Sequence, residues 1–215
     1  MLEHDRSRRG DGRRAPDEPF LMVPGLASAD AVLIDERTRP DFRDVFVAAV
    51  RRSVDVAVAV HRVRLSTVDL SEDDLESVES LRVLVVELNA LTLDAEARLI
   101  RADPRRAPRV GLFRRLLERG RLEVRSAPLG GWCPDFSVFS DADGPRAVLT
   151  GKHWFERPYP HRGPALATLH FADAARLAAR RHGEVWAAAH DVGPAVWSIL
   201  AKAERATRVA PAAAG

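Results

Sequence analysis

The 215-residue chain is poor in cysteine and in lysine. Its single cysteine, Cys133, cannot form an internal disulfide, so we expect a protein of the reducing cytoplasm. Lysine occurs only at positions 152 and 202, and arginine therefore carries almost all of the positive charge. This bias, together with abundant alanine, valine and leucine, is typical of GC-rich bacterial genomes. Arginine richness alone therefore does not indicate a nucleic-acid surface.

Long apolar runs and metal motifs are also missing. No run approaches the roughly 18 residues of a membrane-spanning helix, and the first 19 residues have no apolar core of a signal peptide. HExxH, paired CxxC and Walker-type glycine motifs are absent, so we expect no metal and no cofactor. The net charge is only +2, which is a weak indication of nucleic-acid binding.

Hydrophobic residues make up 46% of the chain, enough for one buried core. Residues 1–19 combine arginine with Asp, Gly and Pro, and we expect them to form a disordered basic tail. Residues 20–206 are expected to form a single domain, and residues 207–215 a second disordered tail.

Helical and strand patterns alternate in the first part of this domain. Two runs, VDVAVAV (54–60) and LRVLVVEL (81–88), are continuous enough for buried strands of a parallel sheet, and a third strand is expected at 122–126. Helical spacing predicts the helices 41–53, 71–80, 91–102 and 110–119. The order predicts an α/β fold with a mixed, mostly parallel sheet flanked by helices.

After residue 126 the pattern changes. Two short apolar runs flank the turn sequence SDADGP and predict an antiparallel hairpin, 135–140 with 146–151. A last strand is expected at 167–171. A long helix follows at 172–190, with Leu177 and Trp186 among its inward residues, and a final helix at 195–206.

This series, with VDVAVAVHRVRLS, LRVLVVE and LLERGRLEVRSAP, resembles one half-domain of the phospholipase D-like phosphodiesterase superfamily. The resemblance covers about residues 41–190 and lies in the element order. It implies that two half-domains pack about a two-fold axis. It also implies a hairpin whose first strand carries His-x-Lys and whose second ends in a Gly-Ser-x-Asn-like corner. In that family one histidine attacks phosphorus, a second protonates the leaving group, and Lys and Asn hold the phosphate oxygens.

On this alignment the chain lacks those groups. Asp135 stands at the histidine position and Ser137 at the lysine position. At the corner Gly151 is kept, but Lys152 and Trp154 replace Ser and Asn. The resemblance therefore implies a degenerate half-domain in which the phosphohistidine reaction cannot use its usual nucleophile.

The segment 152–164, KHWFERPYPHRGP, is dense in functional side chains. One interpretation is an anion-binding loop with Lys152, Arg157 and Arg162 as binders and His153 or His161 as acid and base. The other is a surface loop whose aromatic residues cover the sheet. Asp135 is a further ligand-binding candidate.

Two other positions are weaker candidates. His61 follows strand 54–60 at the edge where parallel sheets present ligands. Cys133 fits a thiolate nucleophile, or a small buried residue beside a glycine turn.

Three functions remain open. The first is a non-enzymatic binding, regulatory or assembly module, with a second copy of the chain or a phosphate-containing ligand as partner. The second is a phosphodiesterase or nuclease, that is a hydrolase, using a relocated histidine. The third is a nucleic-acid-binding accessory protein that uses the arginines of helix 106–119 and the basic tail. It predicts one continuous basic face.

Overall fold

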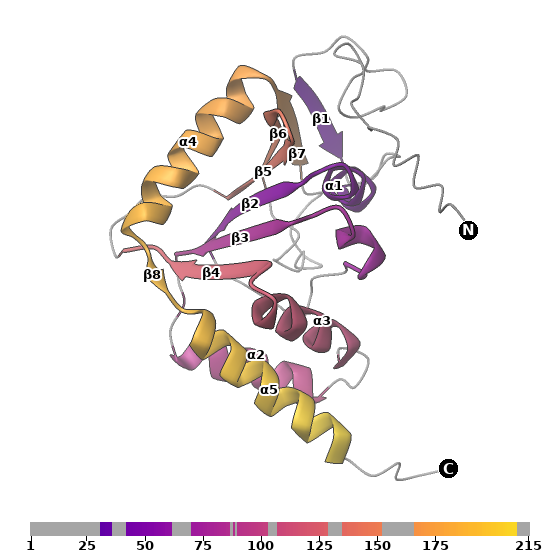
Figure 1. Cartoon of the computed structure of the whole chain (residues 1–215), viewed down its shortest axis with the longest axis vertical. Helices are drawn as coiled ribbons and strands as arrows, with labels where there is room; N and C mark the ends of the chain where they lie inside the picture. Colours follow the sequence, from indigo (N-terminus) through magenta and orange to yellow (C-terminus); the bar gives the residue numbers. More distant parts are fainter. Residues whose placement is uncertain are drawn as a thin grey trace, which may run out of the picture.

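A computed structural model describes residues 31–35, 42–61, 70–86, 88, 90–102, 107–128, 135–151 and 166–209. Eight strands form one sheet in the order β1-β7-β6-β5-β2-β3-β4-β8 (Figure 1). Their bounds are β1 Ala31–Asp35, β2 Asp55–Val60, β3 Ser80–Val85, β4 Leu122–Ser126, β5 Phe136–Asp141, β6 Gly144–Gly151, β7 Leu166–Phe171 and β8 His190–Asp191. The helices are α1 Phe42–Arg51, α2 Ala90–Ala102, α3 Ala107–Glu118, α4 Asp173–Ala188 and α5 Gly193–Val209, with one 3-10 turn at Asp73–Leu75.

The expected mixed α/β sheet with flanking helices is confirmed, but its parallel part is smaller than predicted. Only β2 with β3 and β3 with β4 pair in parallel, and the other five pairings are antiparallel. The reason is that β5, β6 and β7 pair in antiparallel fashion with one another and with β2, and so extend the sheet beyond β2. The predicted hairpin of β5 and β6 is present. Strand β1 lies at one edge of the sheet.

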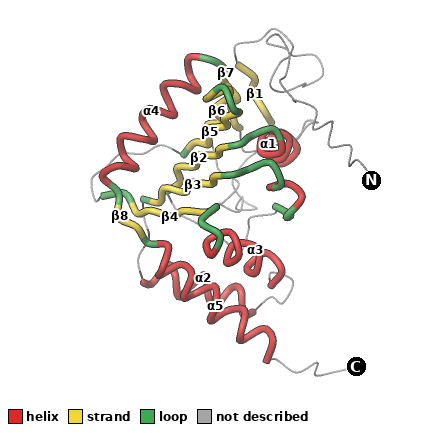
Figure 2. The backbone as a smooth tube through the Cα atoms, viewed as in Figure 1, coloured by secondary structure: helices red, strands yellow, loops and turns green. Residues whose placement is uncertain are grey.

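Strand alternation divides the core between the two sides of the sheet. Val56, Val58 and Val60 of β2 belong to the larger cluster, which also takes side chains from α1, α3 and α5. Ala57 and Ala59 belong to the smaller cluster, to which α4 contributes. Figure 2 shows α4 standing apart from the other helices. Among the described helices, α4 is thus the one that covers the second side.

Several element bounds differ from the sequence-based expectation. The helix expected at 71–80 is wrong: one 3-10 turn is present, and Ser80 already belongs to β3. The Ser71 hydroxyl accepts a hydrogen bond from the backbone N–H of Asp74 (3.2 Å), and the Asp74 carboxylate accepts one from the backbone N–H of Ser71 (2.9 Å). This is the arrangement of a helical capping box. The helix does not continue because Glu79 and Ser80 donate to Val54 O (2.7 and 3.2 Å), which draws the chain into the sheet.

Two differences concern the C-terminal part. Leu177 of α4 was expected to face inward but is 63% exposed. Helix α5 reaches Val209, three residues into the expected tail. The expected tail 1–19, residues 20–30 and residues 210–215 lie outside the described residues. None of the described helices is long and apolar enough to cross a membrane.

Candidate functional site

The candidate site lies at one edge of the sheet, where the parallel strands β2, β3 and β4 end. The register pairs Val60 with Val85 and Val85 with Ser126, so the three strands end together. The antiparallel strand β5 begins at this edge, and β6 ends there, because Phe136 pairs with Ala59 and with Thr150. The topology therefore brings the start of β5 and the Gly151 corner to the carboxyl ends of the parallel strands.

Two predicted site residues meet at this edge. The carboxylate of Asp135 accepts a hydrogen bond from the backbone N–H of His61, with Oδ1 2.7 Å from the nitrogen. Asp135 is half-buried, and His61 is exposed. The bond joins the end of β2 to the start of β5, 74 residues later in the chain. Asp135 therefore holds two strand ends together, and ligand binding by Asp135 and His61 stays a prediction.

Ser137 is fully buried, with 0% of its surface exposed. It follows Asp135 by two residues and so belongs to the same side of β5, between Val58 of β2 and Leu149 of β6. Its hydroxyl has no hydrogen-bond partner within the described part of the chain. The position that the resemblance assigns to a phosphate-binding lysine is thus occupied by a small side chain inside the core.

Gly151 ends β6 with a φ of 114°, a conformation that side-chain-bearing residues rarely adopt. The backbone conformation alone therefore explains why glycine is retained at this corner, without any catalytic role. The other predicted site residues, Lys152, His153, Arg157, His161 and Arg162, lie outside the described residues, as does Cys133. Segment 152–165 connects Gly151 and Leu166, which flank it at the same edge.

Sequence reasoning missed a polar cluster under α4. His182 is 1% exposed, and its Nε2 lies 3.3 Å from the carbonyl oxygen of Val58. Its ring stacks on Trp186 (5.4 Å between centroids) and meets the Phe136 ring edge-on (6.3 Å). Its Nδ1 finds no partner among the described residues. The inward spacing of His182 and Trp186, four residues apart on one helix, was the available signal.

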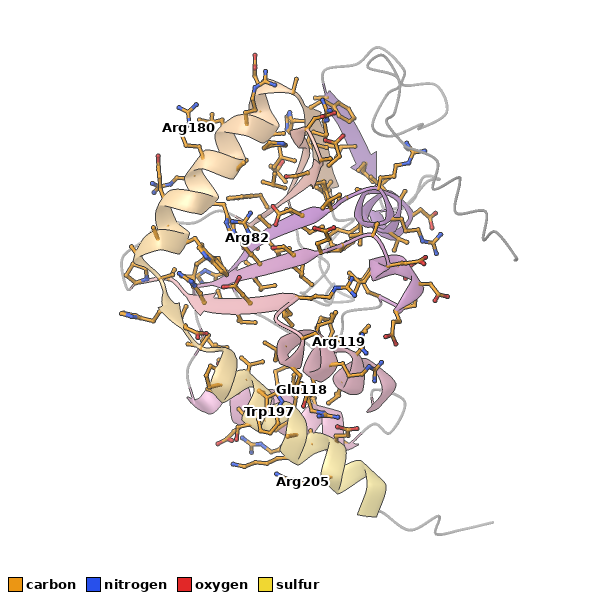
Figure 3. The ribbon with its side chains drawn as sticks, in the orientation of Figure 1. Arg82, Glu118, Arg119, Arg180, Trp197 and Arg205 are labelled. Atoms are coloured by element: carbon orange, nitrogen blue, oxygen red, sulfur yellow. The ribbon has the colours of Figure 1, made fainter. Side chains whose placement is uncertain are left out.

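Charged residues surround this imidazole. Arg82 of β3 forms an ion pair with Asp55 of β2 (2.7 Å), and Figure 3 shows Arg82 on the side of the sheet that carries α4. Burial, and then the positive charge of Arg82, lower the pKa of His182 to about 4. Arg125 of β4 lies over the Trp186 ring, 4.6 Å from its centroid. At neutral pH His182 is therefore an uncharged core residue, poorly suited to protonating a ligand.

The described arginines at the C-terminal end of α3, and Arg119 directly after it, do not form a free basic face. Arg114 pairs with Glu204 of α5 (2.7 Å) and with Glu118, and Arg115 pairs with Glu72 (2.9 Å). Arg119 also approaches Glu72, at 3.8 Å. Acids are thus interspersed among the described arginines of this helix. In the described part of the chain no group of three or more His, Cys, Asp or Glu residues is placed to hold a metal ion.

No protein-family model and no curated protein matches the chain. Solved structures do resemble it. TrmBL2, an archaeal chromatin protein whose structure shows a mode of DNA binding, has a TM-score of 0.50 and 12% identity over 80% of this chain. The chain spans 56% of the length of that protein. At this identity the likeness establishes a shared fold alone.

Members of the phospholipase D family are also among the similar structures. Nuc from Salmonella typhimurium has a TM-score of 0.47 and 9% identity, over 75% of this chain and 96% of Nuc. Phosphatidylserine synthase of Haemophilus influenzae Rd KW20 has a TM-score of 0.48 and 10% identity, over 81% of this chain and 45% of the synthase.

Replacement of Asp135 should reveal its structural role. We expect Asp135→Ala to lower the free energy of unfolding by about 1–2 kcal/mol, because the His61 amide loses a charged acceptor. Asp135→Asn should lose less, since its side-chain oxygen still accepts. Urea unfolding of the three proteins measures the difference. Equal stability of wild type and Asp135→Ala would contradict this role.

Proposed function

We propose that the chain is a non-catalytic phospholipase D-like domain that acts as a binding or assembly module. The observation that carries this proposal is the hydrogen bond from the His61 amide to Asp135. In the family that the sequence resembles, the corresponding side chain is a histidine that attacks phosphorus. A carboxylate that caps a neighbouring strand has a structural task, and its charge repels the phosphate that it would have to attack.

Ser137 supports the same conclusion. A phosphate-binding group must reach the ligand, whereas the Ser137 side chain is enclosed in the core. A serine hydroxyl also lacks the positive charge that stabilises a phosphoryl transition state. Asp135, directly before β5, and Ser137 on β5 therefore lack the groups that the family's reaction needs, and Ser137 leaves the strand well packed.

A phosphodiesterase with a relocated histidine is the second candidate. Its supporting observation is the position of Gly151 and Leu166, since the segment that carries His153 and His161 begins and ends at the edge that also holds Asp135. We rank it second because it requires two new catalytic groups on one segment.

Nucleic-acid binding is a third possibility for the module. The shared fold with an archaeal chromatin protein is compatible with it. The ion pairs of Arg114, Arg115 and Arg119 with glutamates argue against α3 as the contact, because paired arginines offer less charge to phosphates. Binding to DNA, if measured, is expected to be weak and to fall steeply with salt.

The proposal is tested by offering the full chain a labelled single-stranded DNA and a generic phosphodiester. We expect no cleavage of either substrate by wild type, Asp135→Ala or His153→Ala. The two variants, Asp135→Ala and His153→Ala, separate a non-catalytic module from an enzyme with a relocated histidine. Cleavage that is lost only in His153→Ala would establish the relocated-histidine enzyme and refute the proposal.

A further inference from the structure

The joint between β7 and α4 consists of one strained residue. Ala172 separates Phe171, the last residue of β7, from Asp173, the first of α4, and it has φ 49° and ψ −110°. Among the described residues it is the one non-glycine with a positive φ. These angles match the first central position of a type II′ turn, where glycine is strongly preferred. No side chain caps the start of α4.

The segment that follows this joint runs along the outside of the molecule. Figure 1 shows α4, β8 and α5 in succession, with α4 beside the sheet and α5 beside α2 and α3. Everything in the described chain beyond Ala172 belongs to this segment, so one change of backbone angles at Ala172 redirects all of it.

Helix α4 is held to the sheet by few large side chains. Its buried residues are Ala175, His182, Val185 and Trp186. Two buried nitrogens at this contact, Nδ1 of His182 and Nε of Arg125, find no partner among the described residues. Within the described chain the contact therefore leaves buried polar groups unsatisfied, which lowers the free-energy cost of detaching the helix.

Helix α5 and strand β8, in contrast, carry specific contacts. Val196, Leu200 and Ala203 are buried in the larger core cluster. Glu204 pairs with Arg114 of α3 (2.7 Å), and Val192 N donates to Val124 O (3.0 Å). None of these contacts requires that both partners belong to the same polypeptide.

We propose that two copies of this chain exchange residues 173–209, with Ala172 as the hinge. In the exchanged dimer every contact of the segment is reproduced with the other copy, and the strained angles at Ala172 are released. Short strained hinges favour such exchange because the closed and exchanged forms otherwise share their interactions. The inference stands apart from the proposed function, since neither Asp135 nor Ser137 belongs to the hinge or the segment.

The hinge is tested by two substitutions that are expected to change the affinity of the dimer in opposite directions. Ala172→Gly adopts the closed angles without strain and should weaken the dimer, whereas Ala172→Val increases the strain and should strengthen it. Each dimer contains two hinges, so we expect the dissociation constant to rise about 10- to 100-fold in Ala172→Gly. Sedimentation equilibrium of the full-length proteins measures it. Equal constants for wild type and Ala172→Gly would overturn the proposal.

A charge-reversal pair tests the exchange itself. In a copy whose segment folds back on its own chain, Arg114→Glu places the new glutamate opposite Glu204. In the same arrangement, Glu204→Arg places the new arginine opposite Arg114. Either variant alone therefore brings like charges together. When the two variants are mixed, exchange restores an arginine–glutamate pair at both sites. After joint refolding from urea, we expect 1:1 heterodimers well above half of all dimers by native mass spectrometry.

The double variant Arg114→Glu/Glu204→Arg is the control, because it keeps an opposite-charge pair in every arrangement and should dimerise as wild type does. Statistical mixing of the two single variants, or monomers throughout, would overturn the proposal. The charge-reversal test does not depend on the hinge variants and so remains decisive if Ala172→Val does not fold.

Discussion

Ser137→Lys is expected to destabilise the protein by about 4 kcal/mol or more, a large part of the stability of an ordinary domain. The substitution restores the residue type that the phospholipase D-like resemblance places here. In this chain, however, it would put an ammonium group and four methylenes between Val58 and Leu149 at a site with no exposed surface. Burial of an unpaired charge and overpacking both oppose folding.

Ser137→Ala is the matched control for this prediction. It removes a buried hydroxyl that lacks a partner among the described residues, so stability should stay within about 1 kcal/mol of wild type or increase. Urea unfolding followed by circular dichroism compares the three proteins. A Ser137→Lys protein as stable as wild type would mean that an open cleft receives the lysine. The claim that this position has become core would then be wrong.

Acidification is expected to destabilise the protein through His182. The ordinary pKa of histidine is 6.5, and in the folded protein that of His182 is about 4. Between these values the unfolded chain binds a proton that the folded chain excludes. The contribution of His182 is thus fully present above pH 6.5 and is lost as the pH falls through 4. Between pH 7.5 and 4.5 the loss should be about 2.5 kcal/mol.

The physical cause is the environment of the ring. Phe136 and Trp186 surround the imidazole, Arg82 repels its charged form, and Asp55 offsets that repulsion only in part. His182→Gln keeps a donor for the Val58 carbonyl but does not titrate. Its unfolding free energy should therefore fall less on acidification than that of wild type. His190→Gln, at an exposed position, is the matched control and should behave as wild type. Identical pH slopes for His182→Gln and wild type would contradict this assignment.

The central strands could be predicted because their patterns are strong. Runs of β-branched and apolar residues at 54–60 and 81–88 correspond to β2 and β3, and the turn at SDADGP joins β5 to β6. Each of these runs contains a charge near its start, Asp55 in the first and Arg82 in the second. The parallel register pairs Asp55 with Ser80 and Arg82 with Ala57, so the two side chains come close enough to form an ion pair. The sequence contains that pair, but only the register brings it together.

Other features depend on tertiary contacts that no local pattern encodes. The two-residue strand β8 exists because Ser126 and Arg125 of β4 pair with it, and its own sequence, His-Asp, has low strand propensity. The angles of Ala172 follow from joining β7 directly to α4, and alanine gives no signal for them. The contact of Asp135 with His61 spans 74 residues and could be anticipated only in part, from the adjacency of β2 and β5.

The measurement that tests the central claim most directly is the rate at which the full-length wild-type chain hydrolyses bis(p-nitrophenyl) phosphate. The account predicts no release of p-nitrophenol above that of buffer, and the same result for Asp135→Ala. Sustained multiple turnover by wild type, abolished in His153→Ala or His161→Ala, would show that the strand edge still supports phosphodiester chemistry and would contradict it.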